Sequence, residues 1–327
     1  MCSCQMTKDL QTKSASTVAS GPTLEPMGPS SVLVAVLTMV LWGGTAVSNQ
    51  IAMDVIPPVL QGGVRFILAA AFMFPWCWLI GAPLMLKRGE WRAGWLMGLL
   101  LFLQIGTFNI GSAWSNTSHA SILVNSYIFW VAACEVLVFK TVWLGTIQWT
   151  GLVLAGVGCG WVFLNTGPGA GGGIDTPSVS GDLVLALSGF ILAIKILYTK
   201  HAVRNIAPET LILWHDLLGS LMFFITSPMI GERLTGRMTL STWLATLFAG
   251  LIVSGYCFGA NAVLLRRHGA SQVSVYSFGT PVIGVILGVL MRGDQLSSAL
   301  VIGGILVTLG IVFVNRLPAS KIADAAS

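Results

Sequence analysis

Ten apolar runs, each long enough to cross a bilayer as a helix, dominate this chain of 327 residues. A transmembrane helix needs about 20 predominantly apolar residues. Only 9% of the residues are charged, whereas a soluble domain carries about 25%. The sequence therefore predicts an all-α membrane protein with ten transmembrane helices, near residues 32–53, 59–80, 94–113, 119–139, 146–164, 182–199, 211–230, 242–264, 272–291 and 298–316.

Lysine and arginine are concentrated in alternate connections between these runs. With the N-terminus inside, twelve lie on the cytoplasmic side, and three lie outside: Arg233, Arg237 and Arg292. Because cytoplasmic loops collect positive charge, both termini are predicted to be cytoplasmic, in a cell (inner) membrane. The net charge of +5 then requires no nucleic-acid partner. Residues 1–31 and 317–327 are predicted as cytoplasmic tails, the first of them disordered.

Short segments recur about 150 positions apart. "VIPP" at 55–58 resembles "NIAP" at 205–208, and Gly151 and Gly158 match Gly303 and Gly310 at a spacing of 152. A glycine-rich stretch, residues 165–181, separates the halves and is predicted to be an exterior linker. Five spans per copy is an odd number, so the second copy enters the membrane upside down. The pattern predicts two inverted five-helix repeats, 32–164 and 182–316, around a central cavity.

Polar side chains recur at helical spacing on the first, third, fourth, sixth, eighth and ninth spans. Asparagine and glutamine side chains are costly to expose to lipid, which favours a solute cavity. The alternative for serine and threonine is close helix packing with hydrogen bonds between helices. The predicted cavity residues are Trp42, Thr45, Asn49, Gln104, Thr107, Asn125, Ser254, Asn261, Ser274 and Ser277.

Five ionisable residues fall within the predicted spans. Arg65 lies near the exterior end of the second span, where the alternative is that its long side chain extends to the headgroups. The other four are predicted to form a cytoplasmic gate, unless each extends separately to the membrane surface: Glu135, Lys195, His215 and Asp216. No carboxylate falls in the central third of any predicted span, which argues against a proton relay there.

Motifs for chemistry on a substrate are missing from the sequence. No cysteine–histidine cluster has metal-ligand spacing, and neither HExxH nor GxSxG occurs. We therefore expect no cofactor, no metal and no enzymatic activity.

Three stretches resemble the EamA family of the drug/metabolite transporter superfamily: "VLWGG" at 40–44, "RFILAA" at 65–70 and "PVIGVILGVLMRGDQLSSALVIGG" at 281–304. The family's closing pattern is Pro, then Gly-Glu-x-Leu-Thr, then Gly. It reads here as Pro281, Gly293-Asp294-Gln295-Leu296-Ser297 and Gly303. In the first copy, Phe129 replaces the proline and Thr141-Val142 replaces Gly-Glu. The resemblance implies ten helices in two inverted bundles, a central cavity, an arginine near the exterior mouth at Arg65, and export of small metabolites.

These observations predict a secondary transporter that exports a small neutral or zwitterionic metabolite, such as an amino acid, by alternating access. Its partners would be the solute and the lipid bilayer. A membrane-embedded enzyme and a receptor or scaffold without transport are the alternatives. Solute flux without covalent change distinguishes the first from the other two. The coupling ion, and whether the chain forms a homodimer, stay open.

Overall fold

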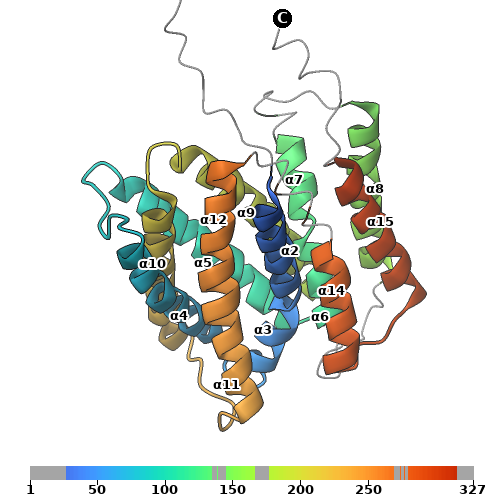
Figure 1. Ribbon diagram of the computed structural model, residues 1–327. Coiled ribbons are helices and arrows are strands. Elements are labelled where there is room, and N and C mark those ends of the chain that lie inside the picture. Colours follow the sequence, from blue (N-terminus) through green and yellow to red (C-terminus); the bar gives the residue numbers. More distant parts are fainter. Residues whose placement is uncertain are drawn as a thin grey trace, which may run out of the picture.

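The computed structural model describes residues 27–134, 138, 145–165, 177–268, 273, 276 and 279–314. All regular structure in these ranges is helical (Figure 1). The first half holds α2 (Pro29–Gly43), α3 (Thr45–Met53), α4 (Pro58–Leu79), α5 (Trp91–Ala113), α6 (Thr117–Val124), α7 (Tyr127–Ala133) and α8 (Thr146–Leu164). The second half holds α9 (Val179–Ala202), α10 (Pro208–Met229), α11 (Leu240–Leu247), the π-helix η2 (Phe248–Cys257), α12 (Phe258–Arg267), α14 (Gly279–Leu287), the π-helix η4 (Gly288–Arg292) and α15 (Ser298–Val314).

Seven helical segments of the described chain are long and apolar enough to cross a membrane, and two shorter apolar helices, Gly279–Arg292 and Ser298–Val314, accompany them. The predicted fourth span is interrupted, because α6 ends at Val124 and α7 begins at Tyr127. Large apolar side chains such as Leu164 and Met229 are 79% exposed, as lipid-facing positions would be. The all-α membrane architecture is thus confirmed, while the count of ten spans stays a prediction.

The two halves begin and end their second long helices in the same way. Both α4 and α10 have 22 residues and start with a proline, Pro58 and Pro208, which lie 150 positions apart. Proline suits the first helical position because its missing N–H would have no partner there. Two residues past each helix lies a glycine with positive φ, Gly81 at 68° and Gly231 at 77°, again 150 apart. Only glycine adopts this left-handed conformation readily, so it stops both helices.

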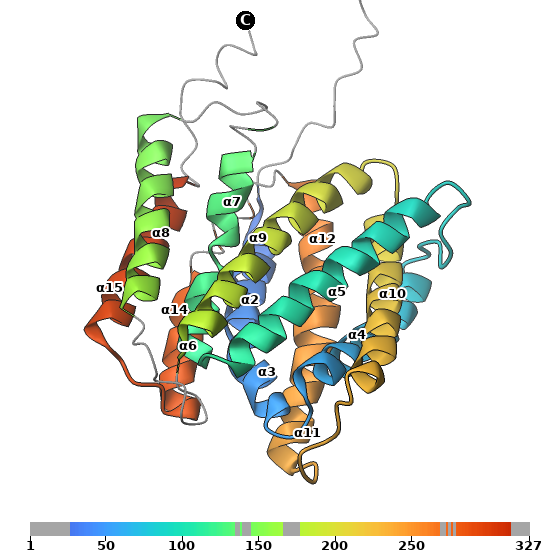
Figure 2. The same ribbon diagram turned by 180° about the vertical axis from the view of Figure 1, so that it is seen from behind.

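α8 and α15 lie side by side at one edge of the molecule (Figures 1 and 2). A Cβ atom on Gly151 would lie 2.7 Å from the carbonyl oxygen of Gly310, and one on Gly158 would lie 2.8 Å from that of Gly303. Glycine thus allows the two backbones to touch. Gly151 faces Gly310 and Gly158 faces Gly303, so residue numbers increase along α8 while they decrease along α15. The two helices therefore run antiparallel.

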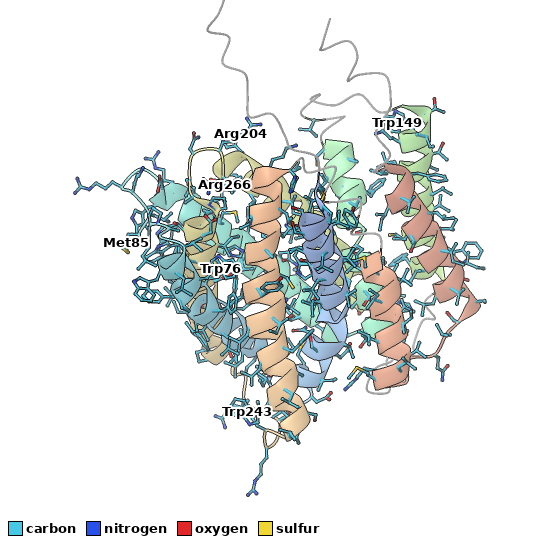
Figure 3. The ribbon with its side chains drawn as sticks, in the orientation of Figure 1. Trp76, Met85, Trp149, Arg204, Trp243 and Arg266 are labelled. Atoms are coloured by element: carbon cyan, nitrogen blue, oxygen red, sulfur yellow. The ribbon has the colours of Figure 1, made fainter. Side chains whose placement is uncertain are left out.

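The start of α2 and the finish of α15 lie at the same end of the molecule (Figure 1), which we call the terminal end. Arg204 and Arg266 lie at this end, and Trp243 lies at the opposite end (Figure 3). Between them, α4, α5 and α10 pack through a core that includes Phe66, Leu101 and Phe223. Phe66 of this core also borders the buried side chain of Arg65.

Candidate solute site

Four ionisable side chains from three helices are buried together in the middle of the fold. Arg65 on α4, Lys195 on α9, and His215 and Asp216 on α10 are each at most 3% exposed. Arg65 is the eighth residue of α4 and Asp216 the ninth of α10, and both helices have 22 residues. We call Arg65, Lys195 and Asp216 the charge cluster.

The position of Asp216 corrects the prediction that no carboxylate occupies the central third of a span. The apolar run begins at residue 211, but the helix begins three residues earlier, at Pro208. That extra turn moves Asp216 into the central third of α10. The cytoplasmic gate that these residues were expected to form stays a prediction.

Arg65 is held inside the protein. Its Nε donates a hydrogen bond to Ser254 Oγ on η2 at 2.7 Å, and its guanidinium lies 5.3 Å from the centroid of the Phe66 ring. Its Nη1 atom is buried and makes no hydrogen bond. With 2% exposure, the side chain does not extend to the headgroups.

Lys195 is fixed by a chain of hydrogen bonds from α9 to α5. Its Nζ donates to Gln104 Oε1 at 3.0 Å, and Gln104 Nε2 donates to Ser188 Oγ at 3.3 Å. The Ser188 hydroxyl donates in turn to the Gln104 carbonyl at 2.9 Å. The ammonium also lies 5.3 Å from the centroid of the Phe258 ring, a distance at which a cation is attracted to the ring face.

Asp216 is the fully buried carboxyl group of this cluster, near the side chains of Lys195 and Arg65. Neither of its carboxylate oxygens accepts a hydrogen bond, although Oδ1 lies 2.8 Å from His215 Nδ1. The His215 ring lies edge-on between Phe66 and Phe258. The carboxylate is thus close to positive charge but has no donor pointing at it.

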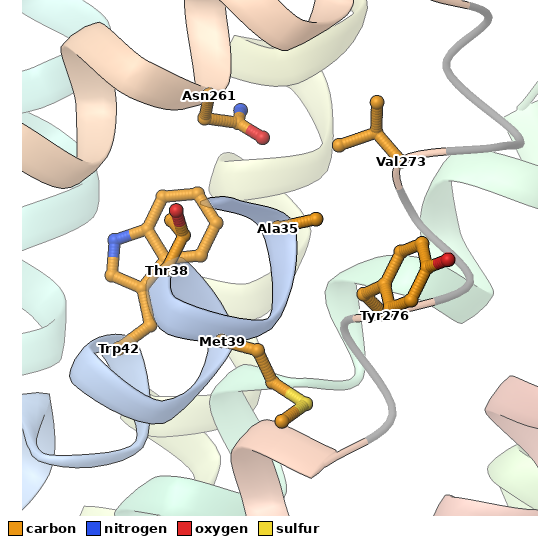
Figure 4. Close-up of a pocket in the computed structure, with 7 residues that line it drawn as sticks. All are labelled: Ala35, Thr38, Met39, Trp42, Asn261, Val273 and Tyr276. Carbon is orange, nitrogen blue, oxygen red and sulfur yellow. The ribbon is translucent and has the colours of Figure 1, made fainter. Parts of the chain in front are cut away.

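A small pocket opens between α2, α12 and the side chains of Val273 and Tyr276 (Figure 4). It includes two predicted cavity residues, Trp42 and Asn261. The Trp42 ring meets Phe258 edge-on at 5.9 Å between centroids, and Lys195 lies over the same phenylalanine. Phe258 therefore separates the pocket from the charge cluster. The other lining residues are Ala35, Thr38, Met39, Val273 and Tyr276.

Several predicted cavity residues use their hydrogen bonds within the protein. Asn49 Nδ2 donates to Asn109 Oδ1 at 2.9 Å, Asn125 Nδ2 donates to the Ser121 carbonyl at 2.6 Å, and the Thr107 hydroxyl donates to the Leu103 carbonyl at 2.7 Å. These contacts fit helix packing as well as a cavity lining. Thr45 is partly buried at the start of α3. Glu135, Ser274 and Ser277 lie outside the described residues.

Among the polar contacts that join the two halves at the end opposite the termini are three side-chain pairs. Asp54 and Arg292 form a bidentate ion pair, with Oδ2 at 2.7 Å from Nη1 and Oδ1 at 3.1 Å from Nη2. Asp294 Oδ2 accepts hydrogen bonds from the amide and the hydroxyl of Ser118, at 2.7 and 2.6 Å. His119 Nδ1 lies 2.9 Å from Asp182 Oδ2. We call these three pairs the inter-repeat contacts.

Sequence reasoning missed these pairs, although one local signal was present. Gly293 has a φ of 72°, so it ends η4 and turns Asp294 back toward α6. Gly288 permits the approach, because a Cβ there would lie 2.7 Å from both Asp294 Oδ2 and Ser118 Oγ. The glycine and acidic residue of the closing pattern therefore have a structural use in this fold.

Apolar helices of membrane length that enclose buried charges define a polytopic membrane protein with a polar interior, where ionisable groups mark solute or ion pathways. The sequence pattern of the EamA-like transporter family matches residues 29–164 and 179–316, so the chain belongs to this family. The protein is accordingly a membrane transporter and not an enzyme.

Its relatives carry transporter names. An uncharacterized transporter of Bacillus subtilis is 23% identical over 303 residues, covering 89% of this chain and 98% of the relative. An uncharacterized inner membrane transporter of Escherichia coli is 24% identical over 88% of this chain and 94% of the relative. A "probable amino-acid metabolite efflux pump" of Salmonella typhimurium is 23% identical over 85% of this chain and 92% of the relative.

A solved protein structure shares the fold. It superposes with a TM-score of 0.65 at 17% sequence identity, covering 92% of this chain and 100% of the other.

Proposed function

We propose that this chain is a secondary transporter that exports a small zwitterionic or neutral metabolite, such as an amino acid, by alternating access. Ten spans in two inverted repeats, with both termini cytoplasmic, would surround the solute path. The antiparallel pairing of α8 with α15 supports the inversion, because these helices close the two halves that the family pattern matches. The name of the Salmonella typhimurium relative supports the solute class.

The observation that carries the proposal is a difference between the two ends of the molecule. The inter-repeat contacts lie at the end opposite the termini. The pocket is instead lined by residues 35–42 of the segment Pro29–Met53, from its half nearer the terminal end to its middle. An alternating-access transporter is expected to be sealed on one side while a path leads from the other. Arg204 and Arg266 at the terminal end support a cytoplasmic side there. The described state is then the one closed to the exterior.

Flux through vesicles that contain only the purified chain tests this proposal. The vesicles are loaded with a mixture of amino acids and other small metabolites, and the solutes outside are identified by mass spectrometry. We expect at least one solute to leave faster than from protein-free vesicles and to be recovered chemically unchanged. A covalently altered solute would indicate an enzyme, and binding without flux would indicate a receptor; either result contradicts the proposal.

A further inference from the structure

We propose that the charge cluster binds the zwitterionic head of an α-amino acid with an apolar side chain, its carboxylate at Arg65 and its ammonium at Asp216. This inference rests on the proposed transport function, and it names the class of solute and the residues that bind it. Lys195 would add a second positive charge near the carboxylate.

The first argument comes from hydrogen bonds that the cluster leaves unmade. Arg65 Nη1 and both carboxylate oxygens of Asp216 are buried and make no hydrogen bond. Buried polar atoms in folded proteins have a partner in about nine cases out of ten. One free donor and one free carboxylate in the same cluster call for a ligand with an acceptor at one end and donors at the other. The carboxylate and ammonium groups of an α-amino acid supply both.

The second argument comes from charge. Buried ions are stable only when they are closely paired and hydrogen-bonded. Within the described part of the chain, no ion pair joins Asp216 to Arg65 or Lys195, although both charges act on it. Asp216 Oδ1 lies 2.8 Å from Nδ1 of the adjacent His215, but it has no direct contact with either Arg65 or Lys195. A zwitterion would complete the pairing on both sides.

The third argument comes from the supports behind the cations. Ser254 fixes the Arg65 guanidinium through Nε and leaves Nη1 free, and Gln104 fixes the Lys195 ammonium. Because these partners orient the charged groups before a ligand arrives, binding costs less ordering entropy. Ser254 and Gln104 were both predicted as cavity residues, and each makes a hydrogen bond to a cation of the charge cluster.

The fourth argument concerns the rest of the ligand. The aromatic rings of Phe66 and Phe258 border the cluster, and Phe258 also contacts Trp42 at the pocket. An apolar side chain would extend along these rings, because burying apolar surface is favourable. A charged side chain would lose hydration there without gaining a partner.

Substrate discrimination is the readout that separates a binding role from a structural one. Export of the standard α-amino acids from vesicles identifies the best solute. That solute is then compared with its α-hydroxy acid, which lacks the ammonium, and with its amine, which lacks the carboxylate. Wild-type protein should favour the amino acid over both analogues by at least about tenfold, since each analogue leaves a buried charge unpaired.

Two substitutions assign the two ends of the ligand. Asp216→Asn should abolish the preference for the amino acid over the hydroxy acid and keep the preference over the amine. Arg65→Gln should do the reverse. Asp216→Glu and Arg65→Lys retain the charges and should retain the preferences, so they serve where a neutral variant fails to fold. Glu90→Gln, at an exposed turn where the Glu90 carboxylate accepts from the Lys87 amide, is the matched control.

The results distinguish failure of this inference from failure of the proposed transport function. Unchanged discrimination in both neutral variants would overturn the inference while transport stands, and the cluster would be structural. Export of other metabolites but of no amino acid would also overturn it and leave transport intact. If no solute moves at all, the proposed function fails, and this inference fails with it.

Discussion

Asp54 and Arg292 come from different repeats and form a bidentate ion pair at the end of the molecule opposite the termini, with Oδ2 2.7 Å from Nη1. The pair joins the loop after α3 to the end of η4. The Asp54 side chain is 44% exposed, and such a pair contributes about 0.2–1 kcal/mol. On its own it biases the closure of this end only weakly.

We predict that Asp54→Asn makes this end open more often. Ala120 on α6 is 0% exposed, so a cysteine introduced there reports opening through its reactivity with a membrane-impermeant thiol reagent. Asp54→Asn should raise that reactivity by no more than about fivefold, since 1 kcal/mol is a factor of about five. Adding Arg292→Gln should have little further effect. Fully additive effects would mean that the two residues act independently.

Helix α8 should tolerate bulk at one glycine and not at another. Gly158 touches the backbone of Gly303 on α15, whereas a Cβ on Gly160 would have no atom within 4 Å. We expect Gly158→Leu to destabilise the fold by about 1–3 kcal/mol, because the two backbones must separate. Gly160→Leu should change little. Thermal unfolding in detergent measures both, and equal melting temperatures would contradict the antiparallel contact.

The sequence predicted the limits of α4 to within one residue, since the expected span 59–80 compares with Pro58–Leu79, but it placed the start of α10 three residues late. Pro58, Pro208, Gly81 and Gly231 act locally, so the limits of α4 and α10 follow from residue type. The depth of Asp216 was wrong, because the search for apolar runs ignored the polar first turn of α10. A proline at the first helical position was the signal that would have corrected it.

The site was less predictable, because its contacts join residues far apart in the chain. Arg65 and Ser254 are 189 positions apart and lie on different repeats. Helical periodicity indicated that Ser254 and Gln104 face the interior, but it does not state which charged group each one meets. The same holds for Asp182, which begins an apolar run in the sequence and accepts from Ser115 at 2.7 Å in the fold.

Orientation in the membrane gives a direct prediction. Arg204 and Arg237 are both exposed, and the positive-inside argument assigns Arg204 to the cytoplasm and Arg237 to the exterior. A cysteine at Arg237 should react with an impermeant reagent applied to whole cells. A cysteine at Arg204 should react only after the membrane is permeabilised. The opposite pattern would require both termini to be exterior.

Gln104 should matter for transport beyond its effect on folding. Gln104→Leu removes the acceptor of the Lys195 ammonium and leaves a buried charge with one partner fewer. Such a loss costs about 1–3 kcal/mol or more, so we expect export to fall about tenfold. Thr150→Val, at an exposed hydroxyl that bonds only within α8, is the control. Flux is normalised to the amount of folded protein, and equal loss of flux and of folded protein would contradict a role in the site.

Alternating access is the central claim, and a cross-link across the inter-repeat contacts tests it most directly. Ser118 and Asp294 have short side chains in direct contact, so cysteines at both positions are placed to form a disulfide. The pair is introduced after the six native cysteines are replaced, with each single cysteine as a control. The account predicts that oxidation stops flux while amino-acid binding from the terminal end persists, and that a reductant restores flux. Undiminished flux through fully cross-linked protein would contradict alternating access.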